Sequence, residues 1–264
     1  MATLILARHG RTTANATGVL AGRTPGVTLD DEGVLQAQEA ARRVAGLPLA
    51  GIVTSPLERC RETASEVRAL QEATPDVTVD ERLVECDYGT WTGGNLADLA
   101  REPLWTTVQA HPAAAAFPEG ESLAQMAARA VEACRAWDAR VEAEHGAGAI
   151  WMAVTHGDVI KAVVADALGM HLDLFQRLSV DPASLSVIRY TPLRPFVLTV
   201  NSVAGDLGAL RPAPPGADGG SAVADPAEAT DAPVGGGAGS VRPAVTTDPA
   251  QESPSGQTAS GRTP

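Results

Sequence analysis

Short apolar runs, typical of buried strands, alternate along the first 200 residues with longer segments of helical periodicity. Thr3–Ala7 and Ala149–Thr155 are continuous apolar runs, and Ser122–His145 carries apolar residues at helical spacing behind Ser122, a candidate N-cap. Further strands are expected at 52–54, 77–79, 184–190 and 196–200, and further helices at 30–44, 57–72, 95–110 and 159–168. Alternating strands and helices predict an α/β fold, a three-layer α/β/α sandwich around a mostly parallel sheet.

The composition changes near residue 204. From Pro212 to Pro264, 39 of 53 residues are Gly, Ala, Ser, Thr or Pro. Such a stretch has little apolar surface to bury against the entropy cost of ordering it. We therefore expect one folded domain over residues 1–203 and a disordered, acidic tail rich in Pro, Gly and Ala over residues 204–264.

Charge and cysteine content narrow the class of protein and its compartment. The chain has 20 Lys+Arg against 32 Asp+Glu, a net charge of -12, whereas binding to nucleic acid or anionic membrane needs a basic surface. We therefore expect neither as a partner. The three cysteines lack any zinc or CxxC spacing, which favours a reducing compartment. The N-terminal apolar run is too short for a signal peptide, and no run approaches the ~18 residues of a membrane span, so we expect a cytoplasmic protein.

Polar segments follow four of the expected strands. These segments are Arg8–Gly10, Ser55–Arg59, Glu81–Glu85 and His156–Asp158. Because ligands of open α/β sheets bind at the carboxyl ends of the strands, we expect two histidines, two arginines and one carboxylate to share a crevice.

This combination of side chains predicts phosphoryl chemistry. Two guanidinium groups match phosphate oxygens, and helix N-termini after Gly10 and Gly157 add N–H donors. A neutral histidine attacks phosphorus, and a second histidine, protonated beside the bound phosphate, donates to the transferring group. A carboxylate protonates the departing alkoxide and later activates water.

The segment Arg8–Asn15 reads R-H-G-R-T-T-A-N and resembles the R-H-G-x-[ST]-x-x-N signature of the histidine phosphatase superfamily, the phosphoglycerate-mutase-like proteins. The resemblance extends from residue 3 to about residue 203. Short stretches of sequence outside the main motifs are similar to an actinobacterial branch labelled phosphomutase. The resemblance implies the phosphoglycerate-mutase-like form of the α/β/α sandwich. Further matching blocks are Ala21-Gly22, Leu29–Gly33, Ser55–Ala64, Glu85–Gly93, Gly120–Ser122 and Thr155–Gly157.

The resemblance also implies a role for each matched residue. His9 is the nucleophile that becomes phosphohistidine, Glu85 is the proton donor, and Arg8, Arg59 and His156 bind the phosphoryl group. No metal and no cofactor are implied. The partners it implies are a small phosphorylated substrate and a second copy of the chain in a homodimer. Further substrate-binding positions are Thr12, Asn15, Ala21, Gly22 and Gly157.

One departure from the family pattern bears on the reaction. Phosphoglycerate mutases carry a long, basic insertion before the G-E-S block, whereas only 34 residues separate Glu85 from Gly120 here, with Arg101 as the sole basic side chain apart from His111. This favours a phosphatase acting on a small phosphorylated metabolite. A phosphomutase and a non-catalytic module that binds phospho-ligands are the alternatives.

Two other chemistries fit parts of the sequence. The stretch from Cys134 to Arg140 fits the C-x5-R motif of cysteine phosphatases, but Cys134 lies on the apolar stripe of an expected helix. His9, His156 and Glu85 are zinc-ligand types, but neighbouring arginines would repel a cation.

Overall fold

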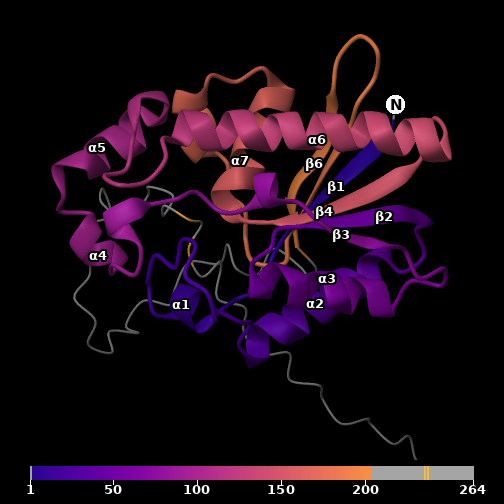
Figure 1. Ribbon diagram of the computed structural model, residues 1–264, viewed down its shortest axis with the longest axis horizontal. Helices are drawn as coiled ribbons and strands as arrows, with labels where there is room; N and C mark the ends of the chain where they lie inside the picture. The colour runs from indigo at the N-terminus through magenta and orange to yellow at the C-terminus, as the bar shows by residue number, and fades with distance from the viewer. Residues whose placement is uncertain (1, 204–234, 236, 238–264) are drawn as a thin grey trace, which may run out of the picture.

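The computed structural model describes residues 2–203 together with residues 235 and 237. These residues form a six-stranded sheet with the order β3-β2-β4-β1-β5-β6 (Figure 1). β2 pairs in parallel with β3 and β4, and β4 in parallel with β1, whereas β5 runs antiparallel to both of its neighbours. The mostly parallel sheet is therefore confirmed. The strands are β1 (Thr3–Arg8), β2 (Leu49–Thr54), β3 (Val77–Val79), β4 (Ile150–Thr155), β5 (Leu185–Arg189) and β6 (Phe196–Ser202).

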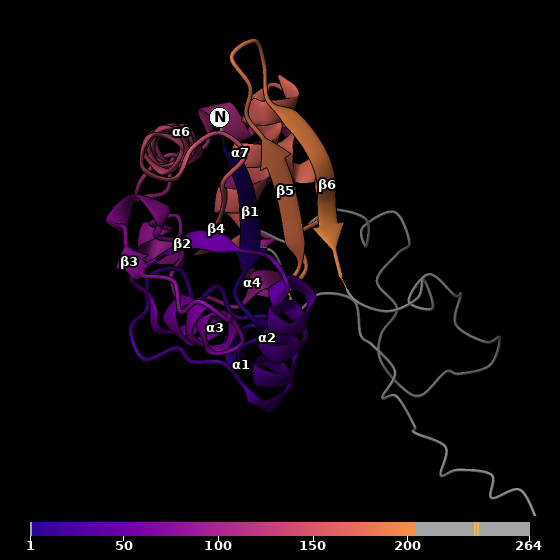
Figure 2. The same cartoon turned by 90° about the vertical axis from the view of Figure 1, so that its right-hand side faces the viewer.

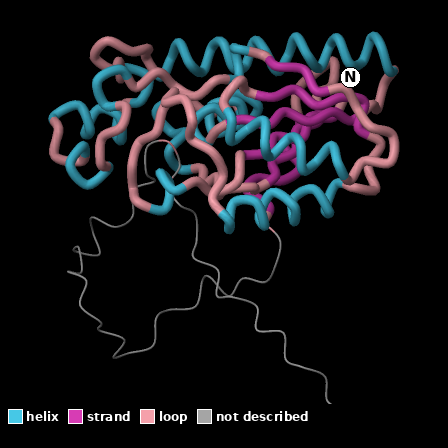
Figure 3. The backbone as a smooth tube through the Cα atoms, turned by 60° about the horizontal axis from the view of Figure 1, so that its bottom comes forward, coloured by secondary structure: helices cyan, strands magenta, loops and turns pink. Residues whose placement is uncertain are grey.

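Helices cover both faces of the sheet. The pair α2 (Asp31–Val44) and α3 (Glu58–Ala69) packs on one face, and α6 (Leu123–His145) and α7 (Gly157–Leu168) pack on the other (Figure 2). Coloured by secondary structure, the strands lie between two helical layers (Figure 3). The three-layer sandwich is thus confirmed. The short helices are α1 (Thr13–Ala16), α4 (Leu96–Leu99) and α5 (Pro103–Ala110), with 3-10 turns at Glu81–Leu83, Gly89–Trp91, Pro112–Ala114 and Leu172–Arg177.

The central strand β1 shows why both faces of the sheet are covered by helices. Along β1, Leu4 and Leu6 belong to the core beneath α6 and α7, whereas Ile5 and Ala7 belong to the core beneath α2 and α3. Strand side chains alternate between the faces, so a strand buried on both sides reads as an unbroken apolar run.

The longest helix begins where the sequence predicts. The Ser122 hydroxyl accepts the Gln125 backbone N–H at 3.1 Å, and the Gln125 side-chain oxygen accepts the Ser122 N–H at 2.9 Å. This reciprocal capping box satisfies two N–H groups that the first helical turn leaves without partners.

Two features differ from or lie beyond the sequence expectations. A helix N-terminus was expected after Gly10, and α1 begins there at Thr13, but its four residues are too few to show a helical period, so its bounds were not predicted. The expected disorder of residues 204–264 falls outside the described part of the chain, apart from Gly235 and Gly237. No helix in the described part is both long enough and apolar enough to cross a membrane.

Candidate active site

Strand pairing brings the two candidate catalytic histidines together. β1 and β4 run side by side in parallel, with Arg8 opposite Thr155, so the next residue of each strand is a histidine. The backbone N–H of His9 donates to the Thr155 carbonyl at 3.0 Å. The His9 and His156 rings meet edge to face, with 5.3 Å between their centroids.

The His9 ring is held in one tautomer. Its Nδ1 lies 2.7 Å from the Gly10 carbonyl oxygen, and a carbonyl can only accept, so Nδ1 carries the proton and Nε2 keeps its lone pair. Burial, followed by the charges of Arg59 and Arg8, holds the pKa of His9 well below its usual range. The ring is therefore neutral at pH 7, as a nitrogen nucleophile requires.

Two buried guanidinium groups flank this ring. Arg8 is the last residue of β1, and Arg59 lies in the first turn of α3. Each side chain is almost fully buried. Arg8 donates from Nη1 to the Val180 carbonyl at 2.8 Å, and Arg59 donates from Nη2 to the Gly22 carbonyl at 2.7 Å. Burial lowers the pKa of Arg8 only to about 10, so the group stays charged.

The charge of these two arginines is not balanced by a paired acid. Within the described residues, neither guanidinium forms an ion pair, and Arg8 Nε and Arg59 Nη1 have no hydrogen-bond acceptor. A buried, unpaired N–H donor costs free energy, and more so when it is charged. An oxyanion at this point would satisfy both donors.

His156 is oriented by its neighbours rather than by its own backbone. Ser55, at the end of β2, places its hydroxyl 2.7 Å from Nε2, and Arg59 Nη2 lies 3.4 Å from Nδ1. A guanidinium can only donate, so Nδ1 carries the lone pair. Burial and the neighbouring cations hold the pKa of His156 well below its usual range. The ring is therefore neutral here, whereas the expectation of a protonated second histidine concerns the site with phosphate bound and stays a prediction.

Glu85 reaches the same pocket from a loop on the other side. The loop is held by Arg129 and Arg23, which donate to the Glu85 carbonyl at 3.1 and 2.9 Å. Burial, followed by the negative charge of Asp158, raises the pKa of Glu85 to about 7. A carboxyl group that still holds its proton near neutral pH is suited to protonate a leaving group.

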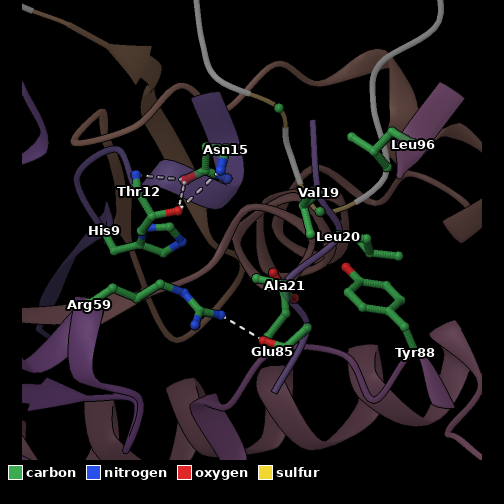
Figure 4. A pocket seen from close by; sticks show the side chains of 13 residues that line it. His9, Thr12, Asn15, Val19, Leu20, Ala21, Arg59, Glu85, Tyr88 and Leu96 are labelled. Carbon is green, nitrogen blue, oxygen red and sulfur yellow. Dashed lines mark hydrogen bonds between the residues drawn. The ribbon is translucent and has the colours of Figure 1, made fainter. Parts of the chain in front are cut away.

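The outer wall of the pocket contains most of the remaining predicted positions (Figure 4). The Asn15 Oδ1 accepts the N–H and hydroxyl of Thr12 at 3.1 and 3.0 Å, so its amide nitrogen remains as a donor. Ala21 and Gly22 line the same cavity. Gly157 does not line it: this glycine is buried at the first position of α7, directly behind His156.

Several residues at the site were not among the sequence candidates. Val19, Leu20, Leu96 and Tyr88 also line the pocket and give it an apolar side. The Tyr88 hydroxyl donates to Asp158 Oδ2 at 2.8 Å, and this carboxylate is fully buried beneath the site. The position of Asp158, directly after the second His-Gly pair, was a signal for it. Val19 and Leu20 come from a loop and Leu96 from the four-residue helix α4, and neither segment carries such a marker.

The two competing chemistries find no support in the geometry. Cys134 is buried in the middle of α6, where burial raises the pKa of its thiol to about 12, rather than in a phosphate-binding loop. Across the described residues, no three His, Cys, Asp or Glu side chains are grouped so as to hold a metal ion.

The fold is a three-layer α/β/α sandwich, and its histidines and arginines cluster at the carboxyl ends of the parallel strands. Residues 4–203 match the model of the histidine phosphatase superfamily (branch 1), and the chain belongs to that superfamily. The resemblance in the sequence is therefore confirmed.

Curated relatives have diverse names. The bifunctional protein Rv2228c of Mycobacterium tuberculosis is 33% identical over 190 residues, which are 71% of this chain and 50% of that protein. The chain thus spans about half the length of this relative, and its similarity supports the actinobacterial branch. A phosphoglycerate mutase dependent on 2,3-bisphosphoglycerate, from Thermoplasma acidophilum, is 28% identical, over 70% of this chain and 85% of the mutase. Phosphoserine phosphatase 1 of Hydrogenobacter thermophilus is also 28% identical, over 76% of this chain and 92% of that phosphatase.

Solved structures share the architecture. The YhfR protein of Bacillus stearothermophilus superposes with a TM-score of 0.69 at 26% identity, over 77% of this chain and 98% of its own. The folded body described above thus corresponds to nearly the whole of that protein.

Proposed function

We propose that this protein is a metal-independent phosphomonoester hydrolase that works through a phosphohistidine on His9. One observation carries the proposal: the neutral His9 ring lies beside two buried guanidinium groups that form no ion pair with any carboxylate in the described part of the chain. Such a site favours a small dianion next to a nitrogen nucleophile.

The reaction balances with the residues of the pocket. Nε2 of His9 attacks phosphorus, the bond from phosphorus to the ester oxygen breaks, and Glu85 gives its proton to that oxygen. In the second half, Glu85 as carboxylate takes a proton from water, whose oxygen attacks phosphorus while the bond to His9 breaks. Arg8, Arg59 and His156 would hold the phosphoryl oxygens, and Arg59 Nη1 and Arg8 Nε are free to donate.

The wall of the pocket favours hydrolysis over mutase activity. A mutase must hold a second anionic group of its substrate, but the side chains opposite His9 are Val19, Leu20 and Leu96. Arg101, the basic side chain of the 86–119 segment, is 80% exposed and pairs with Asp98 at the surface. Relatives include both mutase and phosphatase names, so the proposal of hydrolysis is supported by the pocket wall rather than by the relatives.

Replacing the nucleophile tests the proposal. In His9→Ala, hydrolysis of p-nitrophenyl phosphate should fall by about a thousandfold or more, and acid-labile phosphate should no longer be trapped on the protein. His145→Ala, at the C-terminal end of α6, is the matched control and should retain full activity. Robust turnover by His9→Ala, or activity that a chelator abolishes, would refute the mechanism.

The two alternatives separate in the same assay. Isomerisation of 3-phosphoglycerate in the presence of a bisphosphoglycerate primer, rather than release of phosphate, would indicate a mutase. Stabilisation by phosphate with no release from any ester would indicate a binding module.

A further inference from the structure

Two glycines from beyond the folded body contact the candidate active site. Gly235 and Gly237 line the same pocket as His9, Arg59 and Glu85, although the continuous described chain ends at residue 203. The family match also ends at residue 203, so these glycines lie outside the region that matches the family.

The contacts are polar and specific to the peptide backbone. Arg8 Nη2 donates to the Gly237 carbonyl at 2.9 Å and to the Gly235 carbonyl at 3.4 Å. The Gly235 N–H in turn donates to Asp158 Oδ2 at 3.0 Å. Arg8 and Asp158 thus present a donor and an acceptor to backbone amides, and hydrogen bonds to charged groups are stronger than neutral ones.

The fit requires glycine at position 235. This residue has a φ of +72°, and a Cβ there would lie 2.9 Å from Leu20 Cδ1 and 3.5 Å from the Tyr88 hydroxyl. Side chains rarely adopt this backbone conformation, and the walls leave little room for one. The sequence provides three consecutive glycines, residues 235–237.

The docked glycines and a phosphoryl group would compete for the same space and the same arginine in the pocket. The cavity that His9, Gly235 and Gly237 line together has a volume of about 20 Å³, which is room for about one water molecule. Nη2 of Arg8 already donates to two carbonyl oxygens of this segment, so among the described residues mainly Nε is left for a phosphoryl oxygen.

We propose that Arg8 and Asp158 form an intrachain docking site for the backbone of Gly235 and Gly237, and that phosphate and this segment bind there in competition. The proposal rests on the proposed function only in taking Arg8 as a phosphoryl ligand. Because the segment belongs to the same chain, its binding is unimolecular, and a few hydrogen bonds are enough to populate the docked form. The apparent association constant for phosphate is then the intrinsic constant multiplied by the fraction of molecules that are not docked.

The test compares inorganic phosphate binding to three full-length proteins by isothermal titration calorimetry. Gly235→Val should bind phosphate about threefold to tenfold more tightly than the wild type, as expected if about two thirds to nine tenths of wild-type molecules are docked. Gly219→Val, the same change at a tail position outside the described residues, controls for added bulk and should match the wild type. Equal affinity of Gly235→Val and wild type, equal tightening by both variants, or no phosphate binding by any of the three would overturn the proposal.

A second measurement reports docking without turnover. In the full-length protein the Gly235 amide should exchange slowly with solvent, and saturating phosphate should speed this exchange and shift its NMR signal. An amide that exchanges at the free-peptide rate before phosphate is added would contradict docking. Neither measurement needs catalysis, so loss of the docking proposal is distinguishable from loss of the phosphohistidine mechanism.

Discussion

The imidazole rings of His9 and His156 meet edge to face at the carboxyl ends of two adjacent parallel strands, with centroids 5.3 Å apart and an interplanar angle of 63°. His9 is fixed by its own loop, through the Gly10 carbonyl, whereas His156 is fixed by the hydroxyl of Ser55 from a third strand. The relative orientation of the two rings therefore depends on Ser55.

Ser55→Ala tests this dependence. Loss of one hydrogen bond of about 1 kcal/mol should lower kcat by roughly fivefold through misplacement of the His156 ring. Ser184→Ala is the matched control, because Ser184 is also buried but its hydroxyl has no partner among the described residues. Steady-state kinetics and the ¹⁵N shifts of His156 check the prediction. A fall in kcat with unchanged His156 shifts would show that Ser55 does not act through this ring.

Glu85→Gln should discriminate between leaving groups. An alkoxide leaves only with a proton, whereas p-nitrophenolate leaves without one. Hydrolysis of an alkyl phosphate should therefore fall by about 10²-fold or more, and that of p-nitrophenyl phosphate by less than about tenfold. Glu81→Gln, on the exposed 3-10 turn just before the loop, is the control. Equal losses on both esters would remove Glu85 from the role of acid.

The pH profile should report the same carboxyl group. Burial first, and then Asp158, raises the pKa of Glu85 to about 7, so kcat/KM for an alkyl ester should decline as the pH rises through 7 and Glu85 loses its proton. Asp158→Asn removes the negative charge beside Glu85 while keeping the shape of the side chain. The decline of kcat/KM should therefore move to lower pH by about one unit. Asp166→Asn, on the same helix, should leave it in place. A decline that does not move in Asp158→Asn would show that Asp158 has no influence on Glu85.

The sequence was sufficient to predict the parts of this site that lie on strand ends. Arg8, His9 and His156 each follow an apolar run, and parallel pairing of β1 with β4 is the arrangement that short strand–helix alternation favours. The strand-end argument also placed a carboxylate of the Glu81–Glu85 segment at the crevice, but only the family pattern singled out Glu85, because the loop that carries it follows a three-residue edge strand.

Other features of the fold and the pocket could not be predicted, because no local sequence pattern marks them. The antiparallel direction of β5 depends on the chain that returns from the 3-10 turn Leu172–Arg177 to the sheet. Leu20 enters the pocket from a loop and Leu96 from the four-residue helix α4, and both segments are too short to show a periodic pattern. The contact of Gly235 with Asp158 joins residues 77 positions apart. Composition alone places Gly235 in a stretch with little to bury, so a hydrogen bond from its backbone was beyond prediction.

A close approach of two backbones supports the loop that carries His9. A Cβ on Gly33, in the first turn of α2, would lie 1.9 Å from the Arg11 carbonyl oxygen. Gly33→Ala must therefore push α2 away from this loop, and we expect a loss of about 2 kcal/mol in stability, measured by urea denaturation, together with a lower kcat/KM. Gly46→Ala, where a Cβ meets nothing within 4 Å, should change stability by less than about 0.5 kcal/mol. Similar stability of the two variants would contradict this account.

Glu85 should also lower stability in a pH-dependent way. Its pKa rises from 4.5 to about 7 on folding, so between these pH values the folded protein holds a proton that the unfolded chain releases. The contribution of Glu85 to stability is therefore fully present below pH 4.5, declines as the pH rises, and is lost above about 7. The total change is on the order of 3 kcal/mol.

Glu85→Gln removes this titration while keeping an oxygen that can accept the Cys86 N–H. Relative to the wild type, the variant should gain stability steadily from pH 5 to pH 8, by up to about 3 kcal/mol, as measured by urea denaturation at each pH. The histidines titrate in both proteins, so their contributions cancel in the difference. A difference that stays constant with pH would mean that the Glu85 pKa is not raised by folding, and the same result would remove the physical basis for its role as the acid. A protein that gains stability while losing activity on alkyl esters would show that the buried acid is kept for catalysis and not for the fold.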